Sequence, residues 1–577
     1  MADRGILMAT KFIFVTGGVV SGIGKGITAA VLGCLLKARG LNVLNQKFDP
    51  YINIDPGMMS PTQHGEVFIT DDGSETDLDI GHYERFTDSS LDITSDITTG
   101  MIYRDILQRE RDGGYSGTTV QVVPHIINEI KRHIYQPNRV NQPDILIAEV
   151  GGTVGDMESL PYMEAIRQVS YEVGHENVLF IHVTLIPYLR SSGETKTKPT
   201  QHSVQKLRSL GIQPDILVCR SEKPIDRSVR EKIALYCNVE PECVIQNLDV
   251  ATVYQLPLVL EAEGLAEQAC RKLGLDACLS AKPDLARWER LIERFGKAVQ
   301  PMRIALVGKY LALQDAYLSI MEALRHAGIE TGVDIKIDWI NAEELAVGDP
   351  AKLIGEAAAI LVPGGYGPRG MDGMIIAAQF AREKGIPFLG IGLGMQMAVV
   401  DFARAAAGLE KVHSDESETP CSPIFIMPSP PDSIQMETGI VVNSKTRPMR
   451  RGACDCVLKP GTLMAAAYLS DPADAASATV SERHHHRWEF NMDYLARLEQ
   501  AGMVFSGLSP DGRLVEAIEL TGHPWFVGVI FHPEFKSRPT RPHPLFLDFV
   551  AAALAYQENN RRPAGASTQS ADFPGGK

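Results

Sequence analysis

The chain has 577 residues, 44% of them hydrophobic and 22% charged, which is typical of a globular protein with several domains. Its net charge of -15 and the lack of a long basic run argue against nucleic-acid binding. No apolar run is long enough to span a membrane, and the first ten residues lack the apolar core of a signal peptide. Nine cysteines without metal-ligand spacing indicate free thiols and a cytoplasmic protein.

The first half of the chain alternates short apolar runs with amphipathic segments. Strands are predicted at residues 11–15, 145–150, 178–183 and 216–219, and a helix at about 26–39. This alternation predicts a doubly wound α/β domain with a largely parallel sheet, which we place at residues 1–280.

A glycine-rich segment joins the first predicted strand to the first predicted helix. Backbone N–H groups and a lysine at such a junction can cradle phosphates, although a turn without any ligand is the simpler alternative. Val19 takes the place of the usual first glycine, and no Ser or Thr follows Lys25 to hold magnesium. The segment therefore predicts an ATP site whose metal ligands lie elsewhere. Its phosphate-binding residues would be Ser21, Gly22, Ile23, Gly24, Lys25 and Gly26.

A second series of apolar strands begins at residue 303 and ends near residue 531. It predicts a second doubly wound domain at residues 301–557, preceded by a linker at 281–300. The Pro-, Gly- and Ser-rich segment at 558–577 predicts a disordered tail.

Gly392 lies at the centre of a predicted strand, sharp turn and helix. Glycines at 390 and 394 flank it, a spacing typical of an elbow that exposes a catalytic nucleophile. His532 and Glu534 have the spacing of the base and orienting carboxylate that such a nucleophile needs. The pattern predicts a triad site whose nucleophile position is vacant.

Several long segments resemble the CTP synthase family, whose members use ATP to aminate UTP at ring position 4. The resemblance extends over about residues 11–555 and rests on the strings at 11–26, 47–57, 63–68, 75–86, 149–159 and 196–203. It implies that ATP phosphorylates the 4-oxygen of UTP and that ammonia then displaces phosphate.

The resemblance assigns roles to individual residues of the first half. Lys25 and Lys47 would neutralise the ATP phosphates, with Lys47 a catalytic residue, and Asp79 and Glu149 would hold Mg²⁺. His64 matches a residue on the ammonia passage of the family. UTP or CTP would contact Asp156, Met157, Glu158, Lys196, Gln201 and Lys232. The alternative for each residue is a structural salt bridge or a solvated surface position.

The second half resembles the class I glutamine amidotransferases. Its glutamine pocket would comprise Gly365, Leu393, Gln396, Glu416 and Arg487, with His532 and Glu534 as the remaining triad members.

This half departs from the family at three positions. Gly392 replaces the thiol, Asp372 replaces the usual Glu in the segment that senses the activator GTP, and His485 replaces an Arg. We therefore expect no glutaminase activity, and free ammonia or another small amine as the nitrogen donor. A metal site at the three-His run 484–486 is not expected, because consecutive strand residues face opposite sides.

The family implies a homotetramer that also assembles into filaments, with UTP, ATP and ammonia as its ligands and no membrane or nucleic-acid partner. Two alternatives stay open. One is a non-catalytic nucleotide-binding or regulatory paralogue that co-assembles with an active CTP synthase. The other is a ligase of the same type with a modified acceptor or a different amine.

Overall fold

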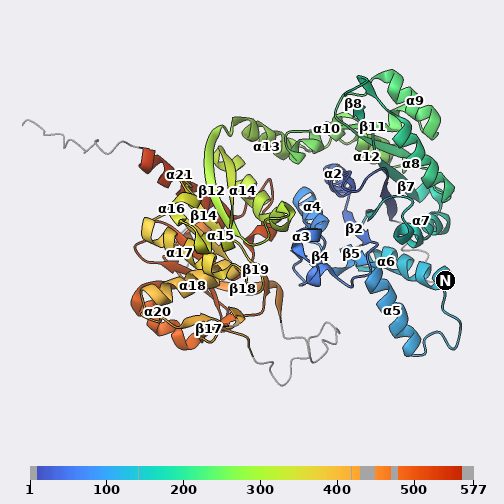
Figure 1. The fold of residues 1–577 in the computed structure, drawn as a ribbon. Coiled ribbons are helices and arrows are strands. Elements are labelled where there is room, and N and C mark those ends of the chain that lie inside the picture. Colours follow the sequence, from blue (N-terminus) through green and yellow to red (C-terminus); the bar gives the residue numbers. More distant parts are fainter. Residues whose placement is uncertain (1–9, 141, 418, 429–448, 470–477, 562–577) are drawn as a thin grey trace, which may run out of the picture.

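The computed structural model describes residues 10–140, 142–417, 419–428, 449–469 and 478–561. Two α/β halves lie against each other, and helix α13 (Ala286–Lys297) connects them at the top of the view in Figure 1. Within the described residues, no helix combines the length and apolar character needed to cross a membrane.

The N-terminal half contains a seven-stranded sheet in the order β11-β10-β7-β1-β6-β2-β5, and its strand pairs are parallel. On β1, Ile13 and Val15 enter one core and Phe12 and Phe14 enter another, so helices cover both faces. The doubly wound arrangement predicted for this half is confirmed. The strands are β1 (Lys11–Gly17), β2 (Val43–Asp49), β5 (Asp96–Thr98), β6 (Ile145–Val150), β7 (Val178–Leu185), β10 (Ile216–Ser221) and β11 (Val244–Leu248).

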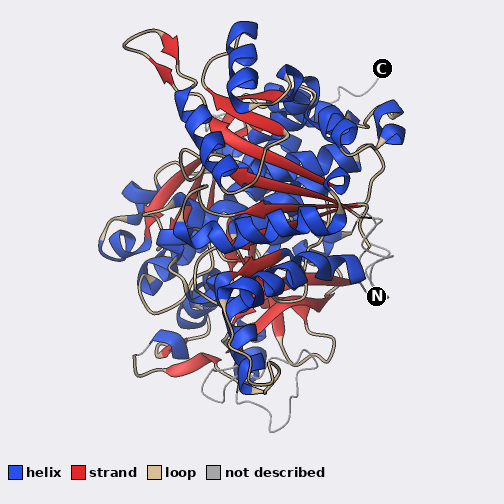
Figure 2. Cartoon of the chain, turned by 90° about the vertical axis from the view of Figure 1, so that its right-hand side faces the viewer, coloured by secondary structure: helices blue, strands red, loops and turns tan. Residues whose placement is uncertain are grey.

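Helices surround this sheet, and Figure 2 shows the strands as inner layers between helices. One core includes residues of α2 (Lys25–Lys37), α4 (Leu78–Thr87), α10 (Leu256–Ala262), α11 (Leu265–Lys272) and α13. The other includes residues of α5 (Thr99–Arg111), α6 (Ile127–Val140), α7 (Leu160–Val173) and α8 (Lys198–Ser209). Helix α9 (Arg227–Cys237) packs in a smaller core beside β10.

The C-terminal half contains a nine-stranded mixed sheet in the order β13-β12-β14-β15-β23-β22-β21-β18-β19. The first five strands pair in parallel and the last four are antiparallel. The sheet comprises β12 (Gln300–Gly308), β13 (Val333–Asn341), β14 (Ala359–Val362), β15 (Phe388–Ile391), β18 (Arg450–Leu458), β19 (Thr479–His486), β21 (Met503–Leu508), β22 (Val515–Leu520) and β23 (Phe526–Val529).

Helices cover both faces of this second sheet as well. Helices α17 (Met371–Lys384) and α18 (Leu393–Ala405) pack on one face, and α14 (Leu318–Thr331) and α21 (Pro544–Arg561) pack on the other. Helix α13 lies within the predicted linker, and α21 continues four residues beyond the predicted domain end at 557. The remainder of the predicted tail lies outside the described residues.

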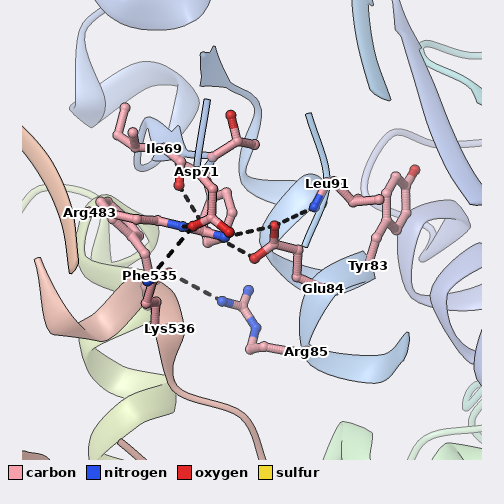
Figure 3. A network of polar contacts seen from close by, with 12 residues as sticks. Ile69, Asp71, Tyr83, Glu84, Arg85, Leu91, Arg483, Phe535 and Lys536 are labelled. Atoms are coloured by element: carbon pink, nitrogen blue, oxygen red, sulfur yellow. Dashed lines mark hydrogen bonds and ion pairs between the residues drawn. The ribbon is translucent and has the colours of Figure 1, made fainter. Parts of the chain in front are cut away.

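A buried network of charges joins the two halves close to the candidate sites (Figure 3). Arg483 on β19 donates to the Asp71 carboxylate at 2.6 Å and to both oxygens of Glu84, at 2.9 and 3.1 Å. Arg538 donates to Glu84 at 2.7 Å. Arg483 and Glu84 are fully buried, so these ion pairs fix how the halves meet.

Candidate functional sites

The phosphate loop lies between β1 and α2, at the carboxyl edge of the parallel sheet. Helix α2 begins at Lys25, whose Nζ donates to the Gly152 carbonyl at 2.8 Å. An added Cβ on Gly26 would lie 2.3 Å from an oxygen of Asp79, so only glycine lets this carboxylate approach the start of the helix. The loop thus brings a lysine, a helix N-terminus and a carboxylate together, as phosphate and cation binding require.

Lys47 stands at the end of β2 among three aspartates. Its Nζ bonds to Asp77 at 2.6 Å, contacts Asp79 more closely and lies 3.6 Å from Asp49. Burial alone would lower the pKa of Lys47, but the carboxylates outweigh it and hold the pKa well above its usual range. The lysine is therefore a fixed positive charge beside the phosphate loop.

Glu149, which is buried, and Asp79, which is half-buried, are carboxylates beside the same lysine. Burial and the Asp79 charge raise the pKa of Glu149 to about 7, and the Tyr83 hydroxyl donates to its carboxylate. Burial acts on Asp79 in the same direction, but Lys47 outweighs it and lowers the Asp79 pKa. Two mutually repelling oxygen donors fit a hard divalent cation such as Mg²⁺, which would relieve the repulsion.

The predicted UTP residues lie along the same edge, in two groups. Asp156 accepts from the Thr153 N–H at 2.8 Å in the loop after β6, and Met157 beside it is 81% exposed. Lys196 pairs with Glu194 at 2.5 Å, and the charge of Lys232 also acts on Glu194. Glu158 follows Met157 in a short 3-10 helix, and Gln201 on α8 donates to the hydroxyl of Thr197, which precedes the helix. No hydrogen bond or ion pair between described residues joins the two groups.

Gly392 forms the turn between β15 and α18. Its φ of 54° and ψ of -110° are unusual for a residue with a side chain, and its N–H donates to the Val529 carbonyl at 2.8 Å. A Cβ built at this position would lie 3.4 Å from His532 Nε2 and 3.6 Å from Gly364 Cα, which are ordinary contacts. The elbow keeps the backbone of a nucleophile turn and has space for a side chain.

His532 follows β23 and faces this elbow. Its Nδ1 bonds to Glu534 at 2.8 Å, and its backbone N–H donates to the Arg483 backbone carbonyl at 2.8 Å. A carboxylate on Nδ1 fixes the tautomer with a lone pair on Nε2. The structure therefore brings the base and its orienting carboxylate to the vacant position.

A cavity of about 100 Å³ lies beside the elbow and between the halves. Glu416 in its wall accepts from the Gly367 N–H at 2.6 Å, and burial raises the pKa of this carboxyl group. Arg487 is not part of the lining, although its charge acts on Glu416. The lining includes the predicted residues Gly365, Gly392, Leu393, Gln396, Glu416, His532 and Glu534.

The three-His run lies at the end of β19. His485 Nε2 bonds across the domain boundary to Glu75 at 2.8 Å, while His486 Nε2 bonds to Glu489 at 2.9 Å. The side chains thus have different partners. Within the described residues, the group with metal-ligand spacing is Asp105, Glu129 and His133, and Arg109 and Arg132 already pair with its Glu129.

A second cavity of about 10 Å³ shares Glu66 and Val67 with the first. It is lined by His64, Tyr51 and Asp77, and Asp77 is also a partner of Lys47. The two cavities therefore adjoin at Glu66 and Val67, and the second extends toward the partners of Lys47.

Three residues of these sites were missed by the sequence analysis. Asp77 caps α4 by accepting from the Asp79 N–H, a role that an Asp just before a helix can signal. Tyr83 and Glu75 gave no such signal, because their partners lie 66 and 410 residues away in the chain.

Comparison with known proteins supports one assignment for both halves. A family model described as CTP synthase N-terminus matches residues 11–275, and one described as glutamine amidotransferase class-I matches 312–552. The CTP synthase of Ruminiclostridium cellulolyticum is 55% identical over 551 residues, covering 95% of this chain and 100% of the relative. That of Symbiobacterium thermophilum is 54% identical over 556 residues, covering 96% and 100%.

Among solved structures, the Trypanosoma brucei CTPS glutaminase domain with bound acivicin is 35% identical and covers 44% of this chain and 94% of that chain, with a TM-score of 0.38. The two bacterial relatives match both halves over almost their entire length. This chain therefore belongs to the CTP synthase family of ATP-dependent ligases.

Proposed function

We propose that this chain makes CTP from UTP, ATP and free ammonia, or another small amine, and does not use glutamine. One observation carries the proposal: position 392 has no side chain, although the base that would activate one lies 3.4 Å from its Cβ position. A thioester needs a thiolate, and glycine supplies none. Loss of a nucleophile typically lowers turnover by several orders of magnitude.

The synthetase half has the charges that phosphoryl transfer requires. Lys25 and Lys47 would neutralise ATP phosphates at the loop between β1 and α2, and Asp79 and Glu149 would hold the metal. Mg²⁺, when bound, would neutralise charge on the phosphate oxygens. Catalysis of this kind depends mainly on positioning and charge stabilisation, which rigid strand ends supply.

The acceptor is proposed to be UTP, held along the carboxyl edge by the residue groups around Asp156 and Lys196. The lysines supply charge for the triphosphate, and carboxylate and amide oxygens can bond to ribose and base edges. Phosphorylation of the 4-oxygen turns a poor leaving group into phosphate. Ammonia then attacks carbon 4 and phosphate leaves.

Ammonia would reach the ring through the two cavities in series. The shared wall at Glu66 and Val67 and the position of His64 beside Asp77 support this route. GTP is proposed as the allosteric activator, as in the family, although Asp372 and His485 depart from the family residues. We further propose a cytoplasmic homotetramer that assembles into filaments, as in the rest of the family.

The direct test supplies purified protein with ATP, UTP, Mg²⁺ and ammonium chloride and measures CTP. The proposal predicts CTP formation. Nucleotide binding without CTP would instead favour a regulatory paralogue.

Gly392→Cys tests whether the missing thiol accounts for the lost use of glutamine. The expected result is a gain of about a thousandfold or more in glutamine-dependent CTP formation, because the base and its carboxylate are already aligned. Gly392→Ala is the matched control, since it adds the Cβ without the thiol and should gain nothing. Equal rates for the two variants would contradict the proposal.

A further inference from the structure

The cavity beside Gly392 has a lining suited to a small cation. None of its described lining residues is a lysine or arginine. Aromatic faces and carboxylates both attract cations, most strongly where little water is present. Besides its imidazoles, the lining combines five aromatic rings with three carboxyl groups, namely Tyr310, Tyr317, Tyr366, Trp488, Phe535, Glu66, Glu416 and Glu534.

His532 presents an unoccupied lone pair to this space. Glu534 engages Nδ1, and no described residue forms a hydrogen bond with Nε2. An atom at the Cβ position of residue 392 would lie 3.4 Å from Nε2. A nitrogen atom placed slightly closer, where a thiol would otherwise stand, lies within hydrogen-bonding distance.

Two other imidazoles, those of His484 and His485, lie near His532. Burial lowers the pKa of His485 despite its bond to Glu75, and burial lowers the pKa of His484 well below its usual range. Both neighbours are therefore neutral at pH 7 and do not oppose a positive charge on His532. Glu66 from the synthetase half, Glu416 and Glu534 are the carboxyl groups that line the cavity together with His532, and Phe535 stacks on the His532 ring.

We propose that His532 is the base that converts an ammonium ion held in this cavity into ammonia. The inference rests on the proposed function, because it concerns the nitrogen donor of that reaction. His532 Nε2 takes one proton from ammonium, and the electron pair of the broken N–H bond stays on nitrogen. Ammonia moves on through the second cavity, and the imidazolium, held by Glu534, returns its proton to water.

The reaction requires nitrogen in its unprotonated form. At neutral pH almost all ammonia in solution is protonated and has no lone pair with which to attack a carbon. A positioned base that removes the proton locally can supply the reactive form. The nucleophile site of the family would then serve as the entry site for the nitrogen.

The test compares kcat/KM for ammonium between the unmodified chain and His532→Ala, at pH 7 and at pH 9. We express the result as the ratio of kcat/KM of the unmodified chain to that of His532→Ala. This ratio should be about tenfold or more at pH 7 and close to one at pH 9, where free ammonia is abundant. Both proteins have the same synthetase half, so ionisation of groups in that half changes both kcat/KM values equally and does not change their ratio. Glu534→Gln should show a smaller loss with the same pH dependence.

His175→Ala, an exposed histidine beside the opposite edge of the sheet, is the control and should give a ratio of one at both pH values. A ratio for His532→Ala that is the same at pH 7 and pH 9 would overturn the inference, since a structural role predicts a constant loss. Unchanged kcat at saturating ammonium and pH 9 shows that the variant is folded. Absence of CTP from every protein would instead contradict the proposed function.

Discussion

At the residue scale, position 392 has the backbone geometry of a nucleophile turn but no side chain that could react. The turn keeps a φ of 54°, a conformation that costs little for glycine and about 1–3 kcal/mol for other residues. A chain with a catalytic cysteine here would bear that strain. This chain has the same turn without the strain and without the nucleophile.

Gly392→Cys should therefore lower the apparent melting temperature, even if it restores glutamine use. The expected cost is about 1–3 kcal/mol, because the added Cβ has room but its backbone conformation is strained. Gly296→Ala on α13 is the control, since it has open space and helical geometry and should stabilise by about 0.5–1 kcal/mol. A rise in melting temperature for Gly392→Cys would contradict the strain argument.

At the element scale, the start of α14 docks onto Glu66 of the other half. The Glu66 carboxylate accepts from the Ser319 N–H at 2.8 Å and from its hydroxyl at 2.5 Å. Burial nevertheless raises the pKa of Glu66 from 4.5 to about 7, against the opposing effects of Arg85 and Ser319. This helix contact is thus more stable when Glu66 is protonated.

The raised pKa of Glu66 makes the folded protein less stable as pH rises. Between pH 4.5 and 7 the unfolded chain releases this proton before the folded chain does, so stability falls as pH rises, by about 3 kcal/mol in all. Glu66→Gln should therefore raise the melting temperature relative to the unmodified chain at pH 8 and change it little at pH 4.5. Glu356→Gln, at an exposed position, should show no such pH dependence. A rise in melting temperature for Glu66→Gln that is larger at pH 4.5 than at pH 8 would contradict the expected pH dependence.

At the scale of the whole molecule, buried charges hold the two halves in one arrangement. Arg483 is fully buried and pairs with Asp71 and Glu84, which lie about 400 residues away in the sequence. The first cavity is lined by residues of both halves, and the second shares Glu66 and Val67 with it, so the network that orients the halves also shapes the start of the proposed ammonia route.

Arg483→Met should weaken the contact between the halves by about 3–5 kcal/mol, because it removes the buried cation that Asp71 and Glu84 share and leaves Glu84 with Arg538 as its remaining ion-pair partner. Calorimetry should then resolve separate transitions for the two halves. Arg303→Met removes a pair with Asp338 from a side chain that is 64% exposed and should change stability by less than about 1 kcal/mol. Similar effects of the two substitutions would argue against a special role for the buried network.

The sequence predicted features set by local patterns. Apolar runs located the main strands, and glycine spacing located the loop before Lys25 and the elbow at Gly392. It did not predict the partners of Arg483, Glu66 or Glu75, because pairing across a domain boundary depends on how two folded surfaces meet. The antiparallel part of the second sheet was also missed, since strand direction is not encoded in apolar periodicity.

We propose that nitrogen reaches UTP from free ammonia in solution and not from glutamine. The most direct measurement is the rate of CTP formation with glutamine as the only donor, compared with ammonium as the only donor, in one preparation of the unmodified chain. We expect CTP with ammonium and a rate with glutamine no higher than that with no donor. Equal rates with the two donors, together with matching release of glutamate, would contradict it.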